Sequence, residues 1–173
     1  DAEAVATVAV EAAENATSEL AGDGTDTQEA IDAAKAAYNS AAQLVADLPA
    51  GAVKTGLQNR LAAVLEDINA AQEVLDAVND ATKAVDDAEG AAAGLSGDGT
   101  DNQAAIIEAQ DLYITAAGLV EALPESSVKT NLADRLQGIL DQITTAQAAV
   151  DAINDVVQTI DALPDASELT IAD

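Results

Sequence analysis

Apolar residues recur every three or four positions along most of the chain, and this spacing predicts α-helices. Two stretches of the chain show it most regularly, with intervals of 3, 4, 3, 4 and 3 residues. Their positions are Ile31, Ala34, Tyr38, Ala41, Val45 and Leu48, and then Ile106, Ala109, Tyr113, Ala116, Val120 and Leu123. The three prolines fall between apolar runs, and no alternation of β-branched residues occurs. We therefore expect an all-α protein, with the two tyrosines as its largest core side chains.

The chain is one 75-residue unit written twice, as the offset between Thr25 and Thr100 shows (100 − 25 = 75). Tandem units that follow one another without a linker build length in repeat proteins. We expect repeat domains at 1–75 and 76–163. Leu163-Pro164 should end the last helix, and Thr170-x-x-Asp173 has the spacing of a helix cap, so 164–173 is predicted to be a linker into a following domain.

A third apolar seam continues without a change of phase past residue 76, where the second unit begins. It consists of Leu57, Leu61, Val64, Ile68, Ala71, Leu75, Val78, Thr82 and Val85. This pattern predicts one helix from about 53 to 93, roughly 60 Å long, that both units share. The chain would then be two tandem three-helix bundles in a spectrin-like rod. The alternative is a break near Asn79-Asp80, because both residues are good N-caps.

Composition narrows the range of functions. A formal net charge of -26 excludes nucleic acid and anionic membrane surfaces as partners. No apolar run approaches the roughly 18 residues that insertion into a membrane requires. The sequence has no Cys, His, Met, Trp or Phe, which removes thiolate, imidazole and the usual zinc ligands. Because the carboxylates are spread along solvated helix faces, we expect no enzymatic activity.

The Gly-Asp-Gly-Thr-Asp segments at 22–26 and 97–101 are predicted to be tight reversals before a helix. In this interpretation Thr25-x-x-Gln28 and Thr100-x-x-Gln103 form capping boxes, and the last Asp of each segment lies in the first helical turn. The alternative is a calcium site, since oxygen ligands in a Gly-rich turn suit that ion. Its ligands would include Asp23, Asp26, Asp98 and Asp101. The EF-hand pattern is absent, and we expect no other cofactor.

Four of the six basic residues occupy the same places in both units. They are Lys54, Arg60, Lys129 and Arg135. On so acidic a chain we expect each to pair with carboxylates of a neighbouring helix. The alternative is that they form partner contacts with an anionic polymer. Tyr38 and Tyr113 likewise have two interpretations, as core residues or as ligand contacts, and their place in the apolar register favours the core.

Both units contain the stretch Leu-Pro-x-x-x-Val-Lys-Thr-x-Leu-x-x-Arg-Leu, starting at Leu48 and Leu123. With the tail 160–164, Leu169-Thr170 and Asp173, it resembles helical repeats in surface-layer and other large cell-surface proteins of Gram-positive bacteria. The resemblance implies an extracellular, non-enzymatic spacer between other domains of a larger chain, with lateral copies of itself or cell-wall polymer as further partners.

Two other functions stay open at this point. The first is a binding module, either an adhesin or a domain that binds cell-wall polymer. The second is an intracellular acidic protein from a salt-adapted organism, because the chain combines 32 acidic residues with 6 basic ones. A spacer would tolerate surface substitutions, whereas a binding module would lose its ligand when one patch is changed.

Overall fold

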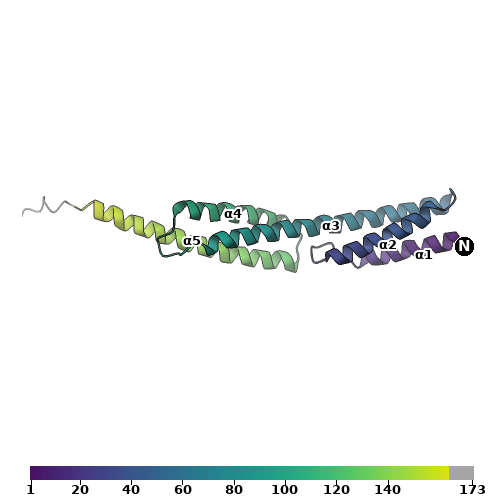
Figure 1. Ribbon diagram of the computed structural model, residues 1–173, viewed down its shortest axis with the longest axis horizontal. Helices are drawn as coiled ribbons and strands as arrows, with labels where there is room; N and C mark the ends of the chain where they lie inside the picture. Colours follow the sequence, from purple (N-terminus) through teal and green to yellow (C-terminus); the bar gives the residue numbers. More distant parts are fainter. Residues whose placement is uncertain (164–173) are drawn as a thin grey trace, which may run out of the picture. The chain divides into compact units, whose positions relative to one another are not determined.

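The computed structural model describes residues 1–163, and its regular secondary structure there is α-helical throughout, which confirms the all-α prediction (Figure 1). The helices are α1 (Ala2–Ser18), α2 (Gln28–Ala46), α3 (Ala52–Ala93), α4 (Gln103–Ala122) and α5 (Ser127–Asp161). The predicted linker at 164–173 lies outside the described residues.

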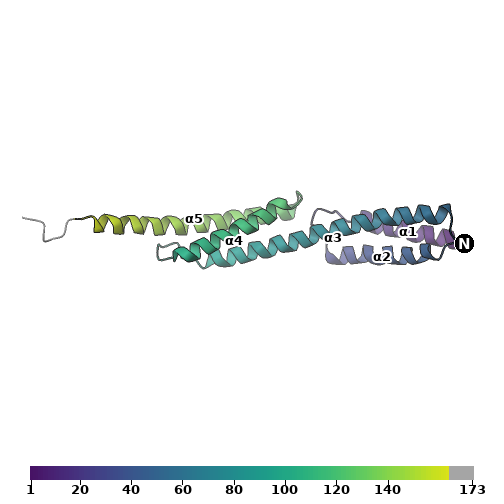
Figure 2. The same cartoon turned by 90° about the horizontal axis from the view of Figure 1, so that it is seen from above.

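Helix α3 is a single helix of 42 residues, and Figures 1 and 2 draw it without a break. The continuous apolar seam predicted this helix to within about one residue at each end. The alternative, a break near Asn79-Asp80, is wrong. Both residues are good N-caps, but no Gly or Pro interrupts residues 57–89, so the preceding turn continues to provide hydrogen-bond acceptors.

The contacts within the structure divide the chain into two compact units, which differ from the 75-residue repeats of the sequence. The first comprises residues 1–82 and 119–132, and the second comprises 83–118 and the residues from 133 onwards. The division by contacts therefore falls inside α3, between Thr82 and Lys83. The sequence period instead separates 1–75 from 76–163, and these domain bounds stay a prediction.

The first unit has one apolar core, to which α1, α2 and the first part of α3 all contribute. Its buried members are Ala6, Val10, Ala13, Ile31, Ala34, Ala41, Val45, Leu48, Leu57, Leu61, Val64, Ile68 and Ala71. The predicted seam of α2 is thereby confirmed, except that Tyr38 is only partly buried and packs against this core. Because Ala buries little surface, close approach of the helices must compensate for small side chains.

The second unit buries the same pattern of positions 75 residues later. Ile106, Ala109 and Ala116 of α4 are buried, as are Leu136, Ile139, Ile143, Ala146 and Val150 of α5. Tyr113, like Tyr38, is only partly buried. The largest fully buried side chains of the described chain are therefore isoleucines, with Ile31 and Ile68 in the first unit, and the prediction that the tyrosines are the largest is wrong.

Candidate functional site

The helices that follow the two Gly-rich turns begin later than predicted. Helix α2 is capped by Thr27, whose hydroxyl accepts the N–H three residues on, and not by Thr25. Before α4, the side-chain oxygen of Asn102 accepts the N–H two residues on at 2.8 Å, and Thr100 has no such role. The capping boxes assigned to Thr25 and Thr100 are therefore wrong, because each of these threonines is engaged inside its turn.

Asp23 and Asp98 each fold their turn around a threonine. Asp23 accepts the N–H of Thr25 at 3.0 Å and its hydroxyl at 2.6 Å, and Asp98 does the same with Thr100 at 2.9 and 2.6 Å. The hydroxyl of Ser96 is an extra donor to Asp98, at 2.7 Å. Donors stabilise the ionised carboxylate, so the pKa of Asp23 is lowered, chiefly by Thr25, and that of Asp98 is lowered to about 2, chiefly by Ser96.

Asp26 and Asp101 close the turns by accepting backbone N–H groups. Asp26 bonds the N–H groups of Ala21 and Gly22 at 2.8 and 2.7 Å, and Asp101 bonds their counterparts at 2.7 and 2.8 Å. The backbone bond from Ser96 is the main cause of a lowered pKa at Asp101. The prediction that these aspartates lie in the first helical turn is wrong, since both precede their helix and bond the chain behind it.

Four turn glycines have positive φ, which confirms the predicted reversals. These are Gly22, Gly24, Gly97 and Gly99, with φ of 66°, 89°, 68° and 88°. Two of them also lie against a helix. A Cβ on Gly24 would be 2.6 Å from Val78 Cγ2, and one on Gly99 would overlap Ile153 and lie 3.1 Å from the Ala149 oxygen. Only glycine combines this backbone conformation with so close an approach.

The carboxylates proposed as calcium ligands, Asp23, Asp26, Asp98 and Asp101, all accept hydrogen bonds from their own turn. Within residues 1–163, no group of three or more acidic side chains is placed to hold a metal ion. Calcium binding at these turns stays a prediction that needs a direct titration.

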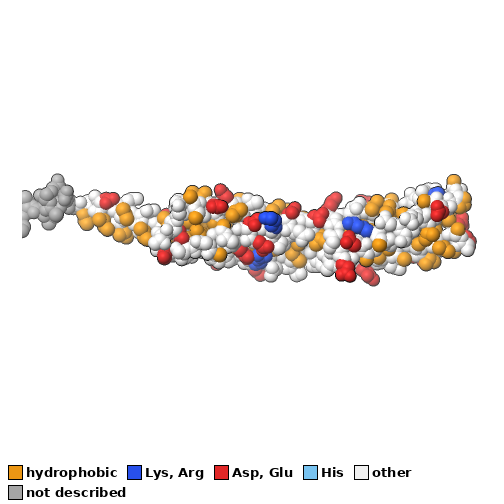
Figure 3. Space-filling view, viewed as in Figure 1, with side chains coloured by type: hydrophobic (Ala, Val, Ile, Leu, Met, Phe, Trp, Pro, Cys, Tyr) orange, Lys and Arg blue, Asp and Glu red, His pale blue; other side chains and the backbone are white. Residues whose placement is uncertain are grey.

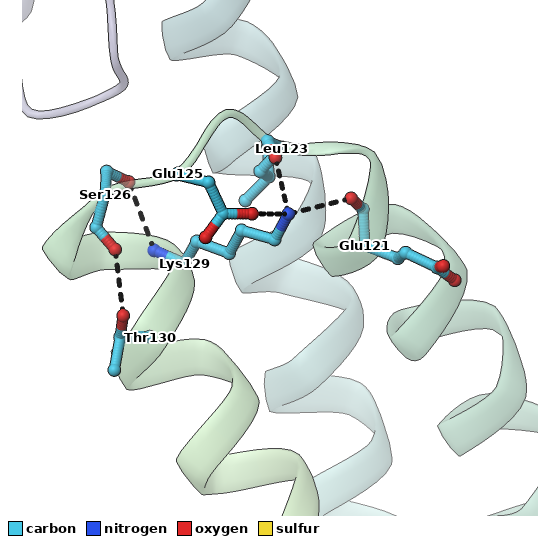
Figure 4. A network of polar contacts seen from close by, with 6 residues as sticks. All are labelled: Glu121, Leu123, Glu125, Ser126, Lys129 and Thr130. Atoms are coloured by element: carbon cyan, nitrogen blue, oxygen red, sulfur yellow. Dashed lines mark hydrogen bonds and ion pairs between the residues drawn. The ribbon is translucent and has the colours of Figure 1, made fainter.

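Lys54 and Lys129 cap the C-terminal ends of the preceding helices. Lys54 Nζ donates to the carbonyl oxygens of Ala46 and Leu48 at 2.7 and 2.9 Å. Lys129 Nζ donates to the corresponding carbonyl oxygens at 3.0 and 2.9 Å, and also to the carboxylate of Glu125 at 2.8 Å (Figure 4). Helix ends leave carbonyl groups without partners, and a lysine satisfies them. The prediction that Lys54 and Lys129 pair with carboxylates of a neighbouring helix is therefore wrong, since the carboxylate partner of Lys129 is Glu125 in the loop before its own helix.

Arg60 and Arg135 do pair with carboxylates of another helix, as predicted. Arg60 of α3 holds Glu14 of α1 through Nε at 2.7 Å and a terminal nitrogen at 2.6 Å. Arg135 of α5 holds Glu89 of α3 in the same way at 2.8 and 2.6 Å, and also bonds Asp86. The arginine bonds lower the pKa of Glu14 and of Glu89 and raise that of both guanidinium groups.

Sequence reasoning missed the glutamine pairs that link helices on the surface. Gln28 of α2 and Gln72 of α3 exchange hydrogen bonds at 2.9 and 3.0 Å, and Lys35 also donates to Gln72. Gln103 of α4 and Gln147 of α5 form the same pair at 2.8 and 3.3 Å. The sequence did contain a signal for them, because the first pair recurs 75 residues later as the second, just as Glu14 recurs as Glu89.

Surface hollows lie beside both Gly-rich turns. One of about 300 Å³ lies against Leu20, Gly22 and Asp67, and a similar one of about 250 Å³ lies against Gly97 and Asp141. Each of these two hollows contains a single carboxylate, and the two carboxylates do not occupy matching positions, since the offset takes Asp67 to residue 142, a glutamine. Two other hollows contain a pair of carboxylates. One of about 240 Å³ has Glu14 and Asp67 beside Arg60, and one of about 470 Å³ has Glu66 and Glu73.

Comparison of the chain with protein-family models, with curated proteins and with solved structures gave no match. None of the helices within residues 1–163 combines the length and the apolar character that crossing a bilayer requires.

Proposed function

We propose that this chain is a non-enzymatic structural repeat that serves as a spacer or stalk in an extracellular, surface-layer-like bacterial protein. One observation carries the proposal: the polar contacts of the first 75-residue repeat recur in the second. The arginine clamp on Glu14 returns on Glu89, and the lysine cap at Lys54 returns at Lys129. Contacts that both 75-residue repeats keep serve the fold of each repeat, which is what a tandem support requires.

The finer architecture belongs to the same proposal. Two tandem three-helix bundles would share α3 in a spectrin-like rod. An unbroken helix of 42 residues, about 60 Å long, supports this arrangement, as does the single core that α1, α2 and α3 build in the first unit. A continuous helix between units resists bending better than a loop would, so the spacing it sets would be well defined.

The basic residues favour a spacer over a module that binds cell-wall polymer. Lys54 and Lys129 bond backbone carbonyl groups, and Arg60 and Arg135 are held by carboxylates. An anionic polymer would have to displace these internal partners and approach a chain of net charge -26. The partners that the proposal favours are therefore flanking domains of a larger chain.

Small-angle X-ray scattering, with calcium and then with a chelator, tests the rod. We expect a long, thin particle with the same maximum dimension in both conditions. A compact particle would contradict the stacked arrangement. One that straightens only with calcium would assign the turns at Asp23 and Asp98 a regulatory role in place of a purely structural one.

Sedimentation with purified Gram-positive cell walls separates the spacer from the binding module. We expect the chain to stay in the supernatant. Retention that disappears when Arg60 and Arg135 are changed to Gln would contradict the spacer, provided that circular dichroism shows an intact helical fold. Glu14→Gln with Asp86→Asn and Glu89→Gln is the matched control, because it removes the same ion pairs and keeps both arginines.

A further inference from the structure

The last part of α5 exposes a stripe of large apolar side chains. It is formed by Ile153, Val156, Val157 and Ile160 of α5 with Leu163 in the bend that follows, and we call it the terminal stripe. Figures 1 and 2 show this end of α5, in yellow, with no other helix of the described chain beside it. In the space-filling view, hydrophobic side chains run along the same segment (Figure 3). Within α5, the spacing of three and four residues from Ile153 to Ile160 places the four side chains on one face of the helix.

The repeat supplies an internal comparison, because α3 carries counterparts of the terminal stripe 75 residues earlier. Ile160 is 59% exposed, whereas its counterpart Val85 is 0% exposed. Val156 is 58% exposed, and its counterpart Ala81 is 0% exposed. The exposed residues are also larger than the buried ones, although exposing larger apolar groups to water is less favourable. The stripe therefore has the composition of a covered surface.

A second comparison concerns the surroundings of the counterparts. Val78 lies under Gly24 and Ile153 under Gly99, in equivalent turns, yet Val78 is 7% exposed and Ile153 is 44% exposed. The two sites differ in their other neighbours, since the hairpin tip at 119–132, between α4 and α5, belongs to the same compact unit as Val78. Nothing equivalent accompanies Ile153 within residues 1–163.

Charge extends the same comparison. In α3, Asp86 follows Val85 and bonds Arg135 of α5. In α5, Asp161 follows Ile160 at the matching position. The terminal stripe thus combines the same two features as the matching part of α3, which are a row of apolar side chains and an acidic group beside it.

We propose that the terminal stripe is a docking face for a helical hairpin of the α4–α5 type, with an apolar seam and an arginine at the place of Arg135. The apolar seam would cover Val156, Ile160 and Leu163, and the arginine would pair with Asp161. This inference rests on the proposed tandem spacer and specifies how one unit receives another. A second copy of the whole chain fits less well, because its net charge of -26 repels an equal charge.

The test joins residues 89–163 once more behind Leu163, so that the added hairpin stands in the register of α4 and α5. Hydrogen exchange of the amides at 153–160 is compared between this extended chain and the original chain. We expect exchange to be slower by about tenfold or more in the extended chain, because covered helix surface opens less often. Equal exchange would overturn the proposal, and so would an added segment without helical structure.

Two substitutions in the extended chain locate the contact. Ile160→Asp should remove the protection, whereas Gln158→Asp should keep it, since the counterpart of Gln158 is the exposed Lys83. Equal effects of the two changes would overturn the assignment to the terminal stripe. Sedimentation velocity of the original chain tests whether a second copy binds the terminal stripe. A dimer that Ile160→Asp dissociates would overturn the proposed hairpin and assign the stripe to a second copy. The scattering and cell-wall measurements use the original chain, so failure here is distinguishable from failure of the spacer function.

Discussion

Arg135 of α5 and Glu89 of α3 are joined by two hydrogen bonds, and they are 46 residues apart in the sequence. Arg60 and Glu14 form the same clamp at the same separation, between α3 and α1. Each clamp fixes the register of a helix pair beside a core built largely of Ala and Val. A seam of small side chains specifies register weakly, so a paired fork of hydrogen bonds adds the geometric information that the core lacks.

The clamp predicts a measurable coupling between Arg60 and Glu14. Arg60→Gln should lower the free energy of unfolding by about 1 kcal/mol, the upper end for pairs that are partly exposed to water. In a double-mutant cycle with Glu14→Gln, urea unfolding should give a coupling energy of the same order. Lys83→Gln, which removes the exposed pair with Asp87, is the control and should have little effect. A coupling energy of zero would reduce the clamp to a surface contact.

Substitutions at the equivalent positions 96 and 21 should shift the pKa values of Asp98 and Asp23 in opposite directions. Ser96 donates to Asp98, whereas Ala21, its counterpart, cannot donate to Asp23. Ser96→Ala should therefore raise the pKa of Asp98 from about 2 towards its ordinary value of 3.8, and Ala21→Ser should lower that of Asp23 further. Carbon-13 NMR titration of the carboxyl groups measures both. Unchanged values would contradict the assigned hydrogen bond.

The same shift predicts a dependence of stability on pH. Because folding lowers the pKa of Asp98, its contribution is complete above the ordinary value of 3.8 and is lost as the pH falls towards about 2. Denaturant unfolding of the parent chain and of Ser96→Ala between about pH 5 and pH 2 should show the two stabilities converging as the acid increases. A difference that grows below pH 4 would have the wrong sign. The comparison cancels the contribution of carboxylates that Ser96 does not bond. It retains a contribution from Asp101, whose pKa the Ser96 hydroxyl also lowers and which acts in the same direction.

The turn glycines predict opposite effects of one substitution. Gly24→Ala should destabilise the chain by more than about 1 kcal/mol, because φ is positive and the new methyl group would overlap Val78. Gly22→Ala should cost less, since φ is positive but the space is open. Gly56→Ala lies in open space inside α3 and should stabilise the chain by roughly 0.5–1 kcal/mol. Thermal unfolding ranks the three, and any other order would refute the packing of the turn on α3.

The continuity of α3 predicts that a break in its middle is felt far along the chain. Asp80→Pro removes a helical hydrogen bond at an exposed position and should cost about 3 kcal/mol or more, whereas Asp80→Ala should be tolerated. Hydrogen exchange should report lost protection at both Val64 and Ile139. Loss at only one of them would mean that the two units unfold independently in spite of the shared helix.

Much of the fold could be predicted from the sequence because its signals are local and written twice. The seam of Leu57 to Val85 predicted an unbroken helix, and the glycines predicted the reversals. The helix starts were placed wrongly because Thr25 had two uses of similar chemistry, a cap for α2 or a donor to Asp23. Thr27 stands two residues on and provides the cap, which leaves Thr25 free for the turn. Sequence spacing alone does not choose between such neighbours.

The sequence by itself determined that this protein is helical, that its helices recur, and which face of each is apolar. These properties depend on the period of a helix and on the conformations that each residue allows. Only the tertiary structure decided that Arg60 meets Glu14, that Lys54 caps a helix end, and that Ile160 is exposed where Val85 is buried. Such contacts depend on which distant segments of the chain come together. A periodic apolar pattern defines one face of a helix but does not specify which other segment packs against that face.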